Sequence, residues 1–417
     1  MKRSPLLVIF ITIFIDLIGF GIVIPILPFY VTSERFAASP RAVGLLLGAY
    51  SLMQFVFAPI LGRLSDRYGR RIVLLLSIIG TGIGFVIMGV APTLLWLFVG
   101  RILDGITGGN ISTAQAYIAD VTKPEERAKG MGLVGAAFGL GFIFGPAIGG
   151  VLSQWGLSAP LYFAAALAFS NAVLLYFVLP ESLSVEARRQ AQTRKRAGGW
   201  QFIREQFANR QLSVVTGVYF LLIVAFSIMT SSFALYALYR FRFDATHIGY
   251  IFSFIGIIAV AVQMLVIRRS VKRFGEVPFV ITGLVGICIG LGVLPLVSPV
   301  AGGLAALLAT TALISIGNQL ASPLLTSLAS KAVSEDVQGG VLGLVGSVGS
   351  LARFVGPVVG AWLIASRANP NAMDDRSLAL TFWTAAAIAA LAGALSLMLR
   401  RGANDSAAQT IEATATD

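Results

Sequence analysis

The sequence is poor in the residues that bind metals or form disulfide bonds. Its 417 residues include one cysteine, Cys288, and one histidine, His247. A single thiol cannot close a disulfide within the chain, and neither residue belongs to a cluster with metal-ligand spacing. We interpret Cys288 as a packing residue and His247 as an interfacial residue or, alternatively, as a pH sensor. The sequence therefore predicts no metal site.

Catalytic and nucleotide-binding patterns are also missing from the sequence. We find no catalytic triad pattern and no phosphate-binding P-loop, which argues against an enzyme and against ATP-driven pumping by this chain. The net charge is +12, but no soluble domain carries a basic cluster, so nucleic-acid binding is the weaker interpretation of that charge. We therefore expect no catalytic residues, no cofactor and no nucleic-acid partner.

Charged residues are scarce, and long hydrophobic runs dominate the chain. Only 12% of the residues are charged and 57% are hydrophobic, whereas soluble domains carry about 25% charged residues. A helix needs about 20 apolar residues to span a bilayer, and runs of this length favour helices over barrel strands. We predict an all-α membrane protein with twelve transmembrane helices. The runs are 6–31, 42–62, 72–92, 94–118, 130–153, 158–180, 212–238, 247–267, 277–297, 301–329, 338–365 and 378–399.

The basic residues are distributed unevenly between the connections. If the N-terminus is cytoplasmic, most of the lysines and arginines fall on the cytoplasmic side, as the positive-inside rule requires. The first run is too long for a signal peptide and lacks a cleavage site, so we interpret it as an uncleaved span. We predict that a lipid bilayer surrounds the chain and that both termini are cytoplasmic.

The two halves of the sequence resemble each other. The pattern G-L-V-G, followed after nine residues by G-P-x-x-G, occurs at 132–149 and again at 343–360. Such a repeat predicts two six-helix halves with a substrate site between them near the middle of the membrane. The predicted parts are an N-terminal half (1–180), a cytoplasmic linker (181–211), a C-terminal half (212–401) and a disordered tail (402–417).

Four charged residues lie inside the hydrophobic runs, namely Asp16, Arg101, Asp104 and Arg353. A charge at the centre of a membrane helix costs about 2.5 to 3.5 kcal/mol. Arg101 and Asp104 are three residues apart and share a helix face. A carboxyl group holds its proton more tightly in an apolar site and less tightly beside an arginine, so Asp16, Arg101 and Asp104 are candidates for proton coupling. The alternatives are a static Arg101–Asp104 ion pair and a hydrogen bond from Asp16 to a neighbouring helix.

Four motifs follow one another along the first half. They are DLIGFGIVIPILP (16–28), GRLSDRYGRR (62–71), RILDGITGG (101–109) and the glycine–proline pattern of 132–150. Each resembles a signature of the major facilitator superfamily, and the second half matches through its repeat and its number of spans. Residues 49–71 resemble most the tetracycline-efflux branch of the twelve-span drug:proton antiporters. Gly84 departs from that branch, which has an acidic residue there as we align it, and span 8 lacks the histidine of that branch.

The resemblance implies a major facilitator fold and a secondary active transporter of the bacterial inner membrane that uses the proton gradient and no cofactor. It implies a monomer that exports small amphipathic molecules, of the tetracycline or multidrug type, in exchange for protons by alternating access, with a role in antibiotic resistance. The departure at Gly84 argues against tetracycline itself rather than against proton-coupled export. The alternative is a proton-coupled symporter or a facilitator that imports a small metabolite.

The resemblance also assigns residues at the predicted cytoplasmic face. It implies that Asp66 contacts the start of span 11 and that Arg70 pairs with Asp120 across spans 3 and 4. These contacts act either as a gate or as a static anchor. The predicted gating residues are Gly62, Asp66, Arg67, Gly69, Arg70 and Asp120.

The glycine–proline pattern in the fifth span has a physical interpretation. Glycines at every fourth position let a second helix approach closely, and a proline can kink the helix. Ordinary tight packing is the alternative, whereas the resemblance implies a kinked, sealed interface that limits leak and favours exchange. The predicted antiporter residues are Gly132, Gly141, Gly145, Pro146, Gly149 and Gly150.

Several polar and aromatic residues inside the spans are candidates for a substrate cavity. Aromatic residues in membrane helices mostly face lipid or core, but a pocket for an amphipathic molecule combines aromatic rings with a few polar groups. The candidates are Tyr50, Gln54, Phe57, Gln115, Phe138, Asn318, Gln319 and Arg353.

Overall fold

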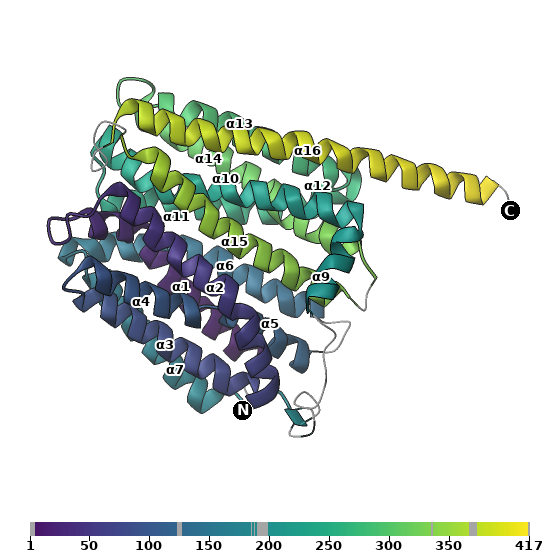
Figure 1. Ribbon diagram of the computed structural model, residues 1–417, viewed down its shortest axis with the longest axis horizontal. Helices are drawn as coiled ribbons and strands as arrows, with labels where there is room; N and C mark the ends of the chain where they lie inside the picture. The colour runs from purple at the N-terminus through teal and green to yellow at the C-terminus, as the bar shows by residue number, and fades with distance from the viewer. Residues whose placement is uncertain are drawn as a thin grey trace. The chain divides into compact units, whose positions relative to one another are not determined.

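The computed structural model describes residues 5–122, 127–184, 186, 188–189, 199–334, 337–366 and 373–415, and most of these residues are helical (Figure 1). The extended structure in these ranges is an isolated bridge between Ser298 and Gly302. Eleven of the described helices are long and apolar enough to cross a membrane. The prediction of an all-α membrane protein is therefore confirmed.

The first part of the chain forms helices that are joined by short turns. Proline occupies the first turn of α2 and of α7, where its missing N–H leaves no helical hydrogen bond unmade. The elements are α1 (Pro5–Thr32), α2 (Pro40–Tyr68), α3 (Arg70–Val90), α4 (Leu94–Thr107), α5 (Asn110–Val121), α6 (Arg127–Leu152), the short 3₁₀ helix η2 (Ser153–Trp155) and α7 (Ala159–Val178).

The second part of the chain is built in the same way. One turn of π-helix interrupts it directly after α11, and a short 3₁₀ turn follows α13. The elements are α9 (Gly199–Ala208), α10 (Arg210–Phe241), α11 (Ala245–Ala261), η3 (Val262–Ile267), α12 (Arg268–Phe274), α13 (Val277–Val293), η4 (Leu294–Leu296), α14 (Gly303–Lys331), α15 (Gln338–Ile364) and α16 (Asp375–Ala415).

The run 94–118, predicted as one helix, is broken into two. α4 ends at Thr107 and α5 begins at Asn110, with Gly108 and Gly109 between them. Neither piece reaches the length of a span, which is why eleven and not twelve described helices qualify. The two glycines weaken the helix, and they leave room for α2, because a Cβ atom on Gly109 would lie 2.8 Å from the Cα atom of Ala58. The prediction of a continuous fourth helix was wrong for this reason.

The chain divides into two compact units. Unit 1 contains 1–195, 230–257 and 353–378, and unit 2 contains 196–229, 258–352 and 379–417. Unit 1 thus holds the predicted N-terminal half together with the end of α10, the start of α11 and the end of α15. The division of the chain into the halves 1–180 and 212–401 stays a prediction.

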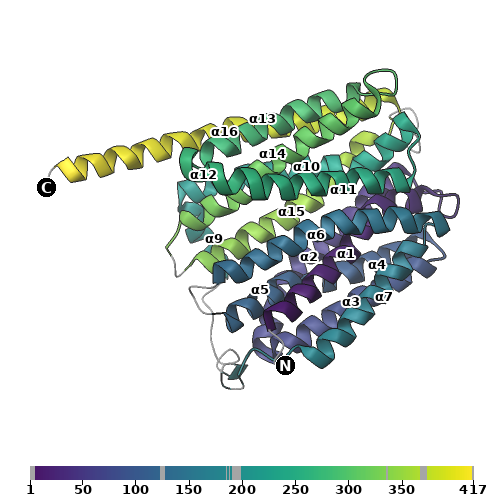
Figure 2. The same ribbon diagram turned by 180° about the vertical axis from the view of Figure 1, so that it is seen from behind.

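Unit 1 has its core around the first half of α1. This helix packs along α6 and α7, and α3 packs against α4 and α7 (Figure 2). The buried side chains of the core come from α1, α3, α5, α6 and α7, and Ile9, Ile13, Leu74 and Tyr117 are among them. This apolar core ends close to Asp16, the first charged residue that α1 places between the other helices.

Unit 2 is organised around the closely packed pair α13 and α14. Glycines face each other at this contact, and a Cβ atom on Gly317 would lie 2.8 Å from the side chain of Ile287. A Cβ atom on Gly283 would likewise lie 3.1 Å from the side chain of Leu320. Small residues therefore set the spacing of these helices, as they do in unit 1.

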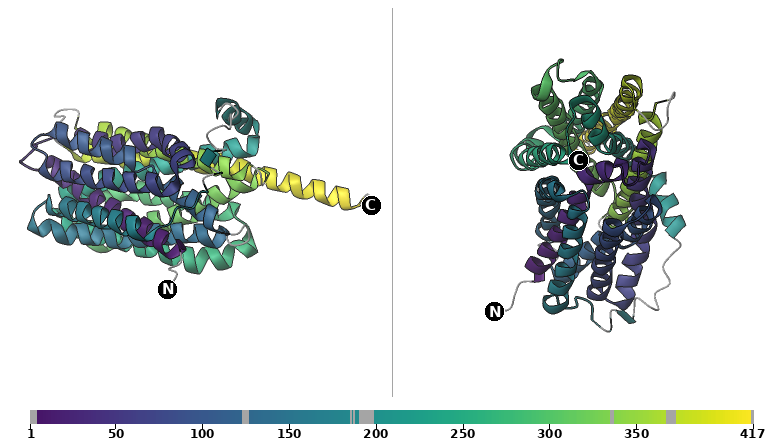
Figure 3. Two further views of the ribbon diagram at one scale, coloured as in Figure 1. Left: turned by 90° about the horizontal axis from the view of Figure 1, so that it is seen from below. Right: turned by 90° about the vertical axis from the view of Figure 1, so that its left-hand side faces the viewer.

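Two predictions concern the connecting and terminal segments. The linker predicted for 181–211 contains α9, while its residues 185, 187 and 190–198 lie outside the described range. The tail predicted to be disordered continues α16 as one helix to Ala415, with residues 416–417 outside the described range (Figure 3). Alanine has the highest helix propensity and recurs along this tail, which accounts for the difference.

Candidate functional site

A buried ion pair lies in α4 of unit 1. The guanidinium of Arg101 donates to the carboxylate of Asp104 at 2.7 Å, and the two side chains are 2% and 5% exposed. The ring of Tyr50 on α2 lies under the same guanidinium, with 4.3 Å between the guanidinium carbon and the ring centre. The two residues that were predicted to share a helix face thus contact each other, and an aromatic ring shields their charge from the opposite side.

Asp16 lies on α1 of the same unit. Its carboxylate accepts a hydrogen bond of 3.3 Å from the side-chain amide of Asn110, the first residue of α5. The break between α4 and α5 therefore places a polar side chain opposite Asp16 inside the membrane. Sequence analysis did not identify Asn110. The signal was present, because Asn110 follows the pair Gly108-Gly109, a pattern typical of a helix end followed by a new helix start.

Polar contacts from α2 hold this break. The amide of Gln54 donates to the carbonyl oxygen of Gly108 at 3.0 Å and to the hydroxyl of Tyr50 at 3.4 Å. A Cβ atom on Gly108 would lie 2.6 Å from that hydroxyl. Tyr50 and Gln54, predicted to line a substrate cavity, thus contact the ion pair and the broken helix, and Tyr50 is buried.

The close contact between α3 and α4 explains why position 84 is a glycine. A Cβ atom on Gly84 would lie 2.9 Å from the carbonyl oxygen of Gly100 and 3.2 Å from the backbone nitrogen of Asp104. An acidic side chain at this position would therefore push α4 and its ion pair away from α3. One turn earlier, the hydroxyls of Thr81 and Thr107 join the same two helices at 3.1 Å.

A second group of charged residues surrounds the turn between α2 and α3. Arg70 contacts Asp66 at 2.6 Å and Asp120 at 3.2 Å, and it also donates to the hydroxyl of Ser65 at 2.6 Å. The pairing of Arg70 with Asp120 that the resemblance implies is present. Arg67 is exposed. The contact predicted between Asp66 and the start of span 11 would join the two units, and it stays a prediction.

Glu181 completes this group, and sequence analysis did not identify it as a site residue. Its carboxylate accepts hydrogen bonds from the backbone N–H groups of Arg70 at 2.9 Å and Arg71 at 3.2 Å, at the start of α3. A carboxylate is favoured at the positive end of a helix dipole. Gly69, with a φ of +113°, leaves the space that this carboxylate occupies. The sequence offered only an acidic residue directly after the sixth hydrophobic run.

The glycine–proline pattern lies where α6 crosses α1. Cβ atoms on Gly141, Gly145 and Gly149 would lie 2.7 Å from atoms of α1, at Leu17, Gly21 and Ile22 respectively. These glycines therefore set the closest approach of the two helices, which lie side by side in Figures 1 and 2. Within the same pattern Gly132 has open space around it.

The other face of α6 packs against the start of α11, within unit 1. Pro146 cannot donate a hydrogen bond to the carbonyl oxygen of Phe142, and this oxygen would lie 2.8 Å from a Cβ atom on Gly256. The hydroxyl of Ser253 donates to the carbonyl oxygen of Ile143 at 2.7 Å. Nearby, a Cβ atom added to Gly150 would lie 3.2 Å from the Cα atom of Gly249. Both faces of α6 around Pro146 are thus closely packed.

A similar contact joins α2 to the end of α15. A Cβ atom on Gly48 would lie 3.2 Å from the side chain of Phe354, and Gly44 faces Pro357 with no room for a side chain. The guanidinium of Arg41 lies 4.9 Å from the centre of the Trp362 ring. Unit 1 is therefore closed by helices of the second half at the end that contains Arg41.

The remaining candidates are dispersed. Phe138 packs on the apolar core of unit 1, Gln115 is exposed, and Phe57 is half-buried. Arg353 acts electrostatically on Tyr50 within unit 1. A Cβ atom on Gly62 would lie 4.0 Å from the hydroxyl oxygen of Ser112, an ordinary contact. Asn318 and Gln319, both half-buried, belong to α14 in unit 2.

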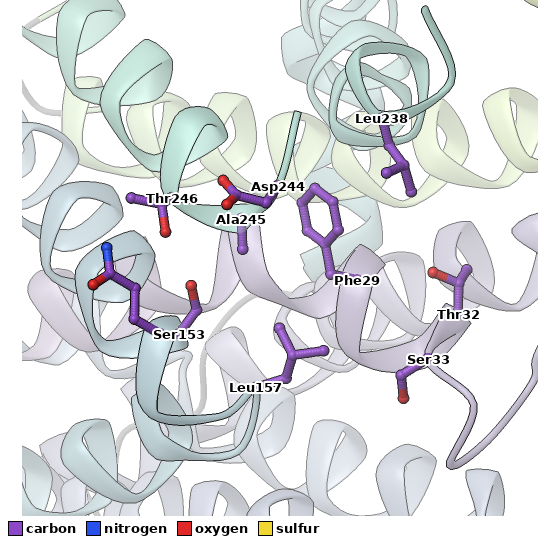
Figure 4. A pocket seen from close by; sticks show the side chains of 10 residues that line it. Phe29, Thr32, Ser33, Ser153, Leu157, Leu238, Asp244, Ala245 and Thr246 are labelled. Atoms are coloured by element: carbon purple, nitrogen blue, oxygen red, sulfur yellow. The ribbon is translucent and has the colours of Figure 1, made fainter. Parts of the chain in front are cut away.

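A cavity of about 380 Å³ opens where α1 ends, next to η2 and the start of α11, and Figure 4 shows the side chains around it. Phe29 and Leu157 form part of its apolar wall, and Asp244 contributes a carboxylate. Burial raises the pKa of Asp244, but hydrogen bonds from the backbone and ring of His247 outweigh it and hold the pKa below its ordinary value. The two side chains are 2.6 Å apart and well exposed. Asp244 also caps α11, since the His247 N–H donates to it.

Comparisons with known proteins agree with this architecture. The Major Facilitator Superfamily matches residues 9–357 and 265–415. The chain is 34% identical to the tetracycline resistance protein, class C, of Escherichia coli, over 88% of this chain and 91% of that protein. It is 30% identical to multidrug resistance protein 2 of Bacillus subtilis, over 87% and 89%.

Solved structures show the same fold. The human organic anion transporter MFSD10 (TETRAN) is 25% identical, with a TM-score of 0.66 over 95% of this chain and 99% of that one. A mutant of the nucleoside transporter NupG is 15% identical, with a TM-score of 0.78 over 94% and 100%. Proteins of this family are transporters without cofactors and not enzymes. This chain is an integral membrane transporter that belongs to the major facilitator superfamily.

Proposed function

We propose that this transporter exports small amphipathic molecules in exchange for protons. The observation that carries the proposal is the buried charge of unit 1, where Asp16 and the Arg101–Asp104 pair lie inside the membrane helices. Buried charges of this kind are costly, and they mark ion and proton pathways in membrane proteins. The names of the relatives, which describe tetracycline and multidrug resistance, support export and a role in antibiotic resistance.

The proton binds to a carboxylate oxygen of Asp104 or Asp16. When Asp104 is protonated, its ion pair with Arg101 weakens, and the guanidinium keeps its contact with the Tyr50 ring. A cationic or polar group of the substrate then competes with the proton for the same charges. Binding of substrate and binding of protons therefore exclude each other, which is the requirement for exchange.

The gate lies at the turn between α2 and α3. Arg70 holds α2, α3 and the end of α5 together through carboxylates at partly exposed positions, namely Asp66, Asp120 and Glu181. Ion pairs in such positions have small net energies, so a conformational change can break and remake them. Alternating access then needs tight, dry packing at the other end, and the contacts of Gly48 and Gly150 support this role.

The membrane arrangement follows from the same proposal. Both termini lie in the cytoplasm of a bacterium, the chain acts as a monomer in the inner membrane, and the two six-helix halves move about the substrate. The packing at Gly84 supports a substrate other than tetracycline, since the side chain found in the tetracycline branch has no room here.

The experiment is transport in inverted vesicles that contain the purified protein and an imposed pH gradient. A panel of fluorescent amphipathic drugs and tetracycline is added, and gradient collapse is recorded for the wild type, Asp16→Asn and Asp104→Asn. We expect collapse that depends on the drug and is lost in at least one variant, while the control Asp244→Asn keeps it. A proton current driven inward by a metabolite would instead favour a symporter, and transport without proton movement would favour a facilitator.

A further inference from the structure

Next to Asp16 the structure has a small enclosed cavity. Its volume is about 10 Å³, which is close to the space that one water molecule needs. The cavity lies between α1, α3 and α5, and most of its wall is apolar. The lining residues are Thr12, Ile13, Asp16, Leu74, Asn110, Ile111 and Ala114.

Thr12 brings an unsatisfied hydroxyl to this wall. The residue is 2% exposed, and its Oγ1 atom has no hydrogen-bond partner among the described residues. Threonines in helices normally donate to the carbonyl oxygen four residues earlier, and others in this chain do so. The examples, at 2.6 to 3.2 Å, are Thr32, Thr107, Thr122, Thr282, Thr311 and Thr326.

Thr12 and Asp16 are one helical turn apart, so both side chains reach the cavity from the same face of α1. Asn110 donates to one oxygen of Asp16 from the opposite side. A water molecule in the cavity therefore has a partner at each end, the Thr12 hydroxyl and the Asp16 carboxyl. Two partners are the minimum for an ordered buried water.

The surroundings of Thr12 are also polar where an apolar core would be expected. The side-chain amide of Asn171 donates to the backbone oxygen of Thr12 at 2.9 Å, while its own oxygen has no partner in the described part of the chain. The buried hydroxyls of Ser77 and Thr113 likewise have no hydrogen-bond partner among the described residues. These two residues lie one helical turn after Leu74 and Asn110, which line the cavity. Such groups are usually paired, and water is the remaining partner.

We propose that one buried water molecule occupies this cavity and joins Thr12 to Asp16, and that Thr12 is a positioning residue for the protonation of Asp16. This inference rests on the proposed proton coupling. When Asp16 is ionised, the water donates one hydrogen to a carboxylate oxygen and accepts the hydrogen of the Thr12 hydroxyl. When Asp16 takes up a proton on that oxygen, the water turns, accepts from the carboxyl group and donates to the Thr12 oxygen. The water keeps two hydrogen bonds in each state, and those to the ionised carboxylate are the stronger ones.

Other charges act on the same region. The charge of Asp104 on α4 acts on Asp16. The charges of Arg101 on α4 and Arg353 on α15 act on the neighbouring Tyr50. From α3 and α5 the polar neighbours are uncharged, namely Ser77 and Asn110. The contribution of Thr12 must therefore be measured with these charges unchanged, which requires a substitution that removes only the hydroxyl.

The test is an infrared titration of Asp16 in the purified full-length protein in lipid nanodiscs. The carboxyl band is assigned by its loss in Asp16→Asn, and the midpoint is compared between the wild type and Thr12→Val, which has nearly the same shape. We expect Thr12→Val to move the midpoint to higher pH by about half to one unit, because the hydrogen bonds of the ionised carboxylate are charge-assisted and the ionised form therefore loses more than the neutral form. Thr12→Ser restores the wild-type midpoint. The control is Thr311→Val, which removes a buried helical hydroxyl that is bonded to its own helix, and it leaves the midpoint unchanged.

A substitution that fills the cavity provides a second, independent test. Ala114→Val excludes the water without touching Thr12, so it shifts the midpoint in the same direction, and the double variant shifts it no further. If Thr12→Val does not fold, the Ala114→Val variant alone tests the proposal. The proposal is overturned if the midpoint is unchanged in the folded variants or if the shifts are additive in the double variant. It is also overturned if Thr311→Val shifts the midpoint equally or if Asp16 does not titrate. The readout needs no transport, so failure of proton-coupled export in vesicles would leave this result standing and would count against the proposed function alone.

Discussion

The two arginine–aspartate centres of unit 1 use the same chemistry in different surroundings. The Arg101–Asp104 side chains are 2% and 5% exposed, whereas Arg70 is 10% and its partners Asp66 and Asp120 are 23% and 22% exposed. Removing one partner of a buried pair leaves an uncompensated charge, but an exposed pair adds little net energy and breaks easily. The more deeply buried pair therefore fits a switch operated by a proton, and the Arg70 group, with its partly exposed carboxylates, fits a contact operated by movement.

The largest effect is expected from Arg101→Leu. It leaves Asp104 without its cation in an apolar site, and breaking such a pair costs about 3 to 5 kcal/mol unless the acid takes up a proton. We expect transport driven by the pH gradient to fall by at least about 100-fold. The readout is drug uptake into inverted vesicles. Arg101→Lys keeps the charge and should retain part of the activity, and full activity in Arg101→Leu would remove the buried pair from the coupling mechanism.

Gly84→Val tests what keeps this pair buried. A side chain here meets the backbone of α4, and overpacking of this kind costs about 1 to 3 kcal/mol. We expect a lower midpoint of thermal unfolding and weaker coupling between drug and proton flux. Gly132→Val is the matched control, since open space surrounds that glycine. Equal losses in both variants would mean that the contact between α3 and α4 has no special role.

Arg70→Leu tests the group at the turn between α2 and α3, whose carboxylates are partly exposed. It removes the contacts with Asp66 and Asp120 but strands no buried charge, so we expect a stability loss of about 1 kcal/mol or less. Transport should fall by about tenfold through a changed conformational equilibrium, and accessibility labelling of single cysteines on both sides of the membrane measures that equilibrium. A loss as large as that of Arg101→Leu would contradict the distinction between the two centres.

Glu181→Gln tests the same group of charges with a smaller chemical change. The amide keeps the shape of the side chain and loses its charge at the start of α3, which costs about 0.3 to 1 kcal/mol. We expect a small decrease in thermal stability that shrinks at high salt, because the site is only partly buried. Glu276→Gln is the comparison, since Glu276 binds Ser327 and Lys331 in unit 2. No salt dependence in Glu181→Gln would argue against the role of the helix dipole.

The smallest effect is expected at the most exposed pair, Asp244 and His247. A carboxyl group whose pKa is lowered in the folded protein adds stability above its ordinary value of 3.8, and this contribution is lost as the pH falls below it. Asp244→Asn should cost less than about 1 kcal/mol at neutral pH, after allowance for solvent screening. Thermal unfolding between pH 3 and 7 measures this, with the wild type and the variant converging at low pH. A difference that persists at the acid end would place the effect in the helix cap and not in the charge.

Much of the fold was predictable because membrane spans have a strong physical signature. The length and apolarity of the runs gave the helices, and the spacing of Arg101 and Asp104 predicted a pair that the structure contains. The break at Gly108 and Gly109 was missed, because a hydrophobic run shows no interruption where one helix ends and the next begins. Hydropathy reports the environment of a segment and not the hydrogen bonding inside it.

The site was less predictable where it depends on contacts between distant residues. Glu181 binds the start of α3 across 111 positions, and Asn110 meets Asp16 across 94. Neither contact leaves a spacing pattern in one sequence. The residues proposed for a substrate cavity show the same limit, because Phe138 belongs to the core and Gln115 is exposed. Type and polarity alone do not say which neighbour a side chain will meet.

The most direct test of the central claim is proton release when substrate binds to the purified protein in weakly buffered solution. We expect an exported drug to release protons from the wild type and from Asp244→Asn, and the double variant Asp16→Asn/Asp104→Asn to release none while it still binds the drug. Proton release that persists in the double variant would contradict the account, because the coupling group would then lie outside the buried centre of unit 1.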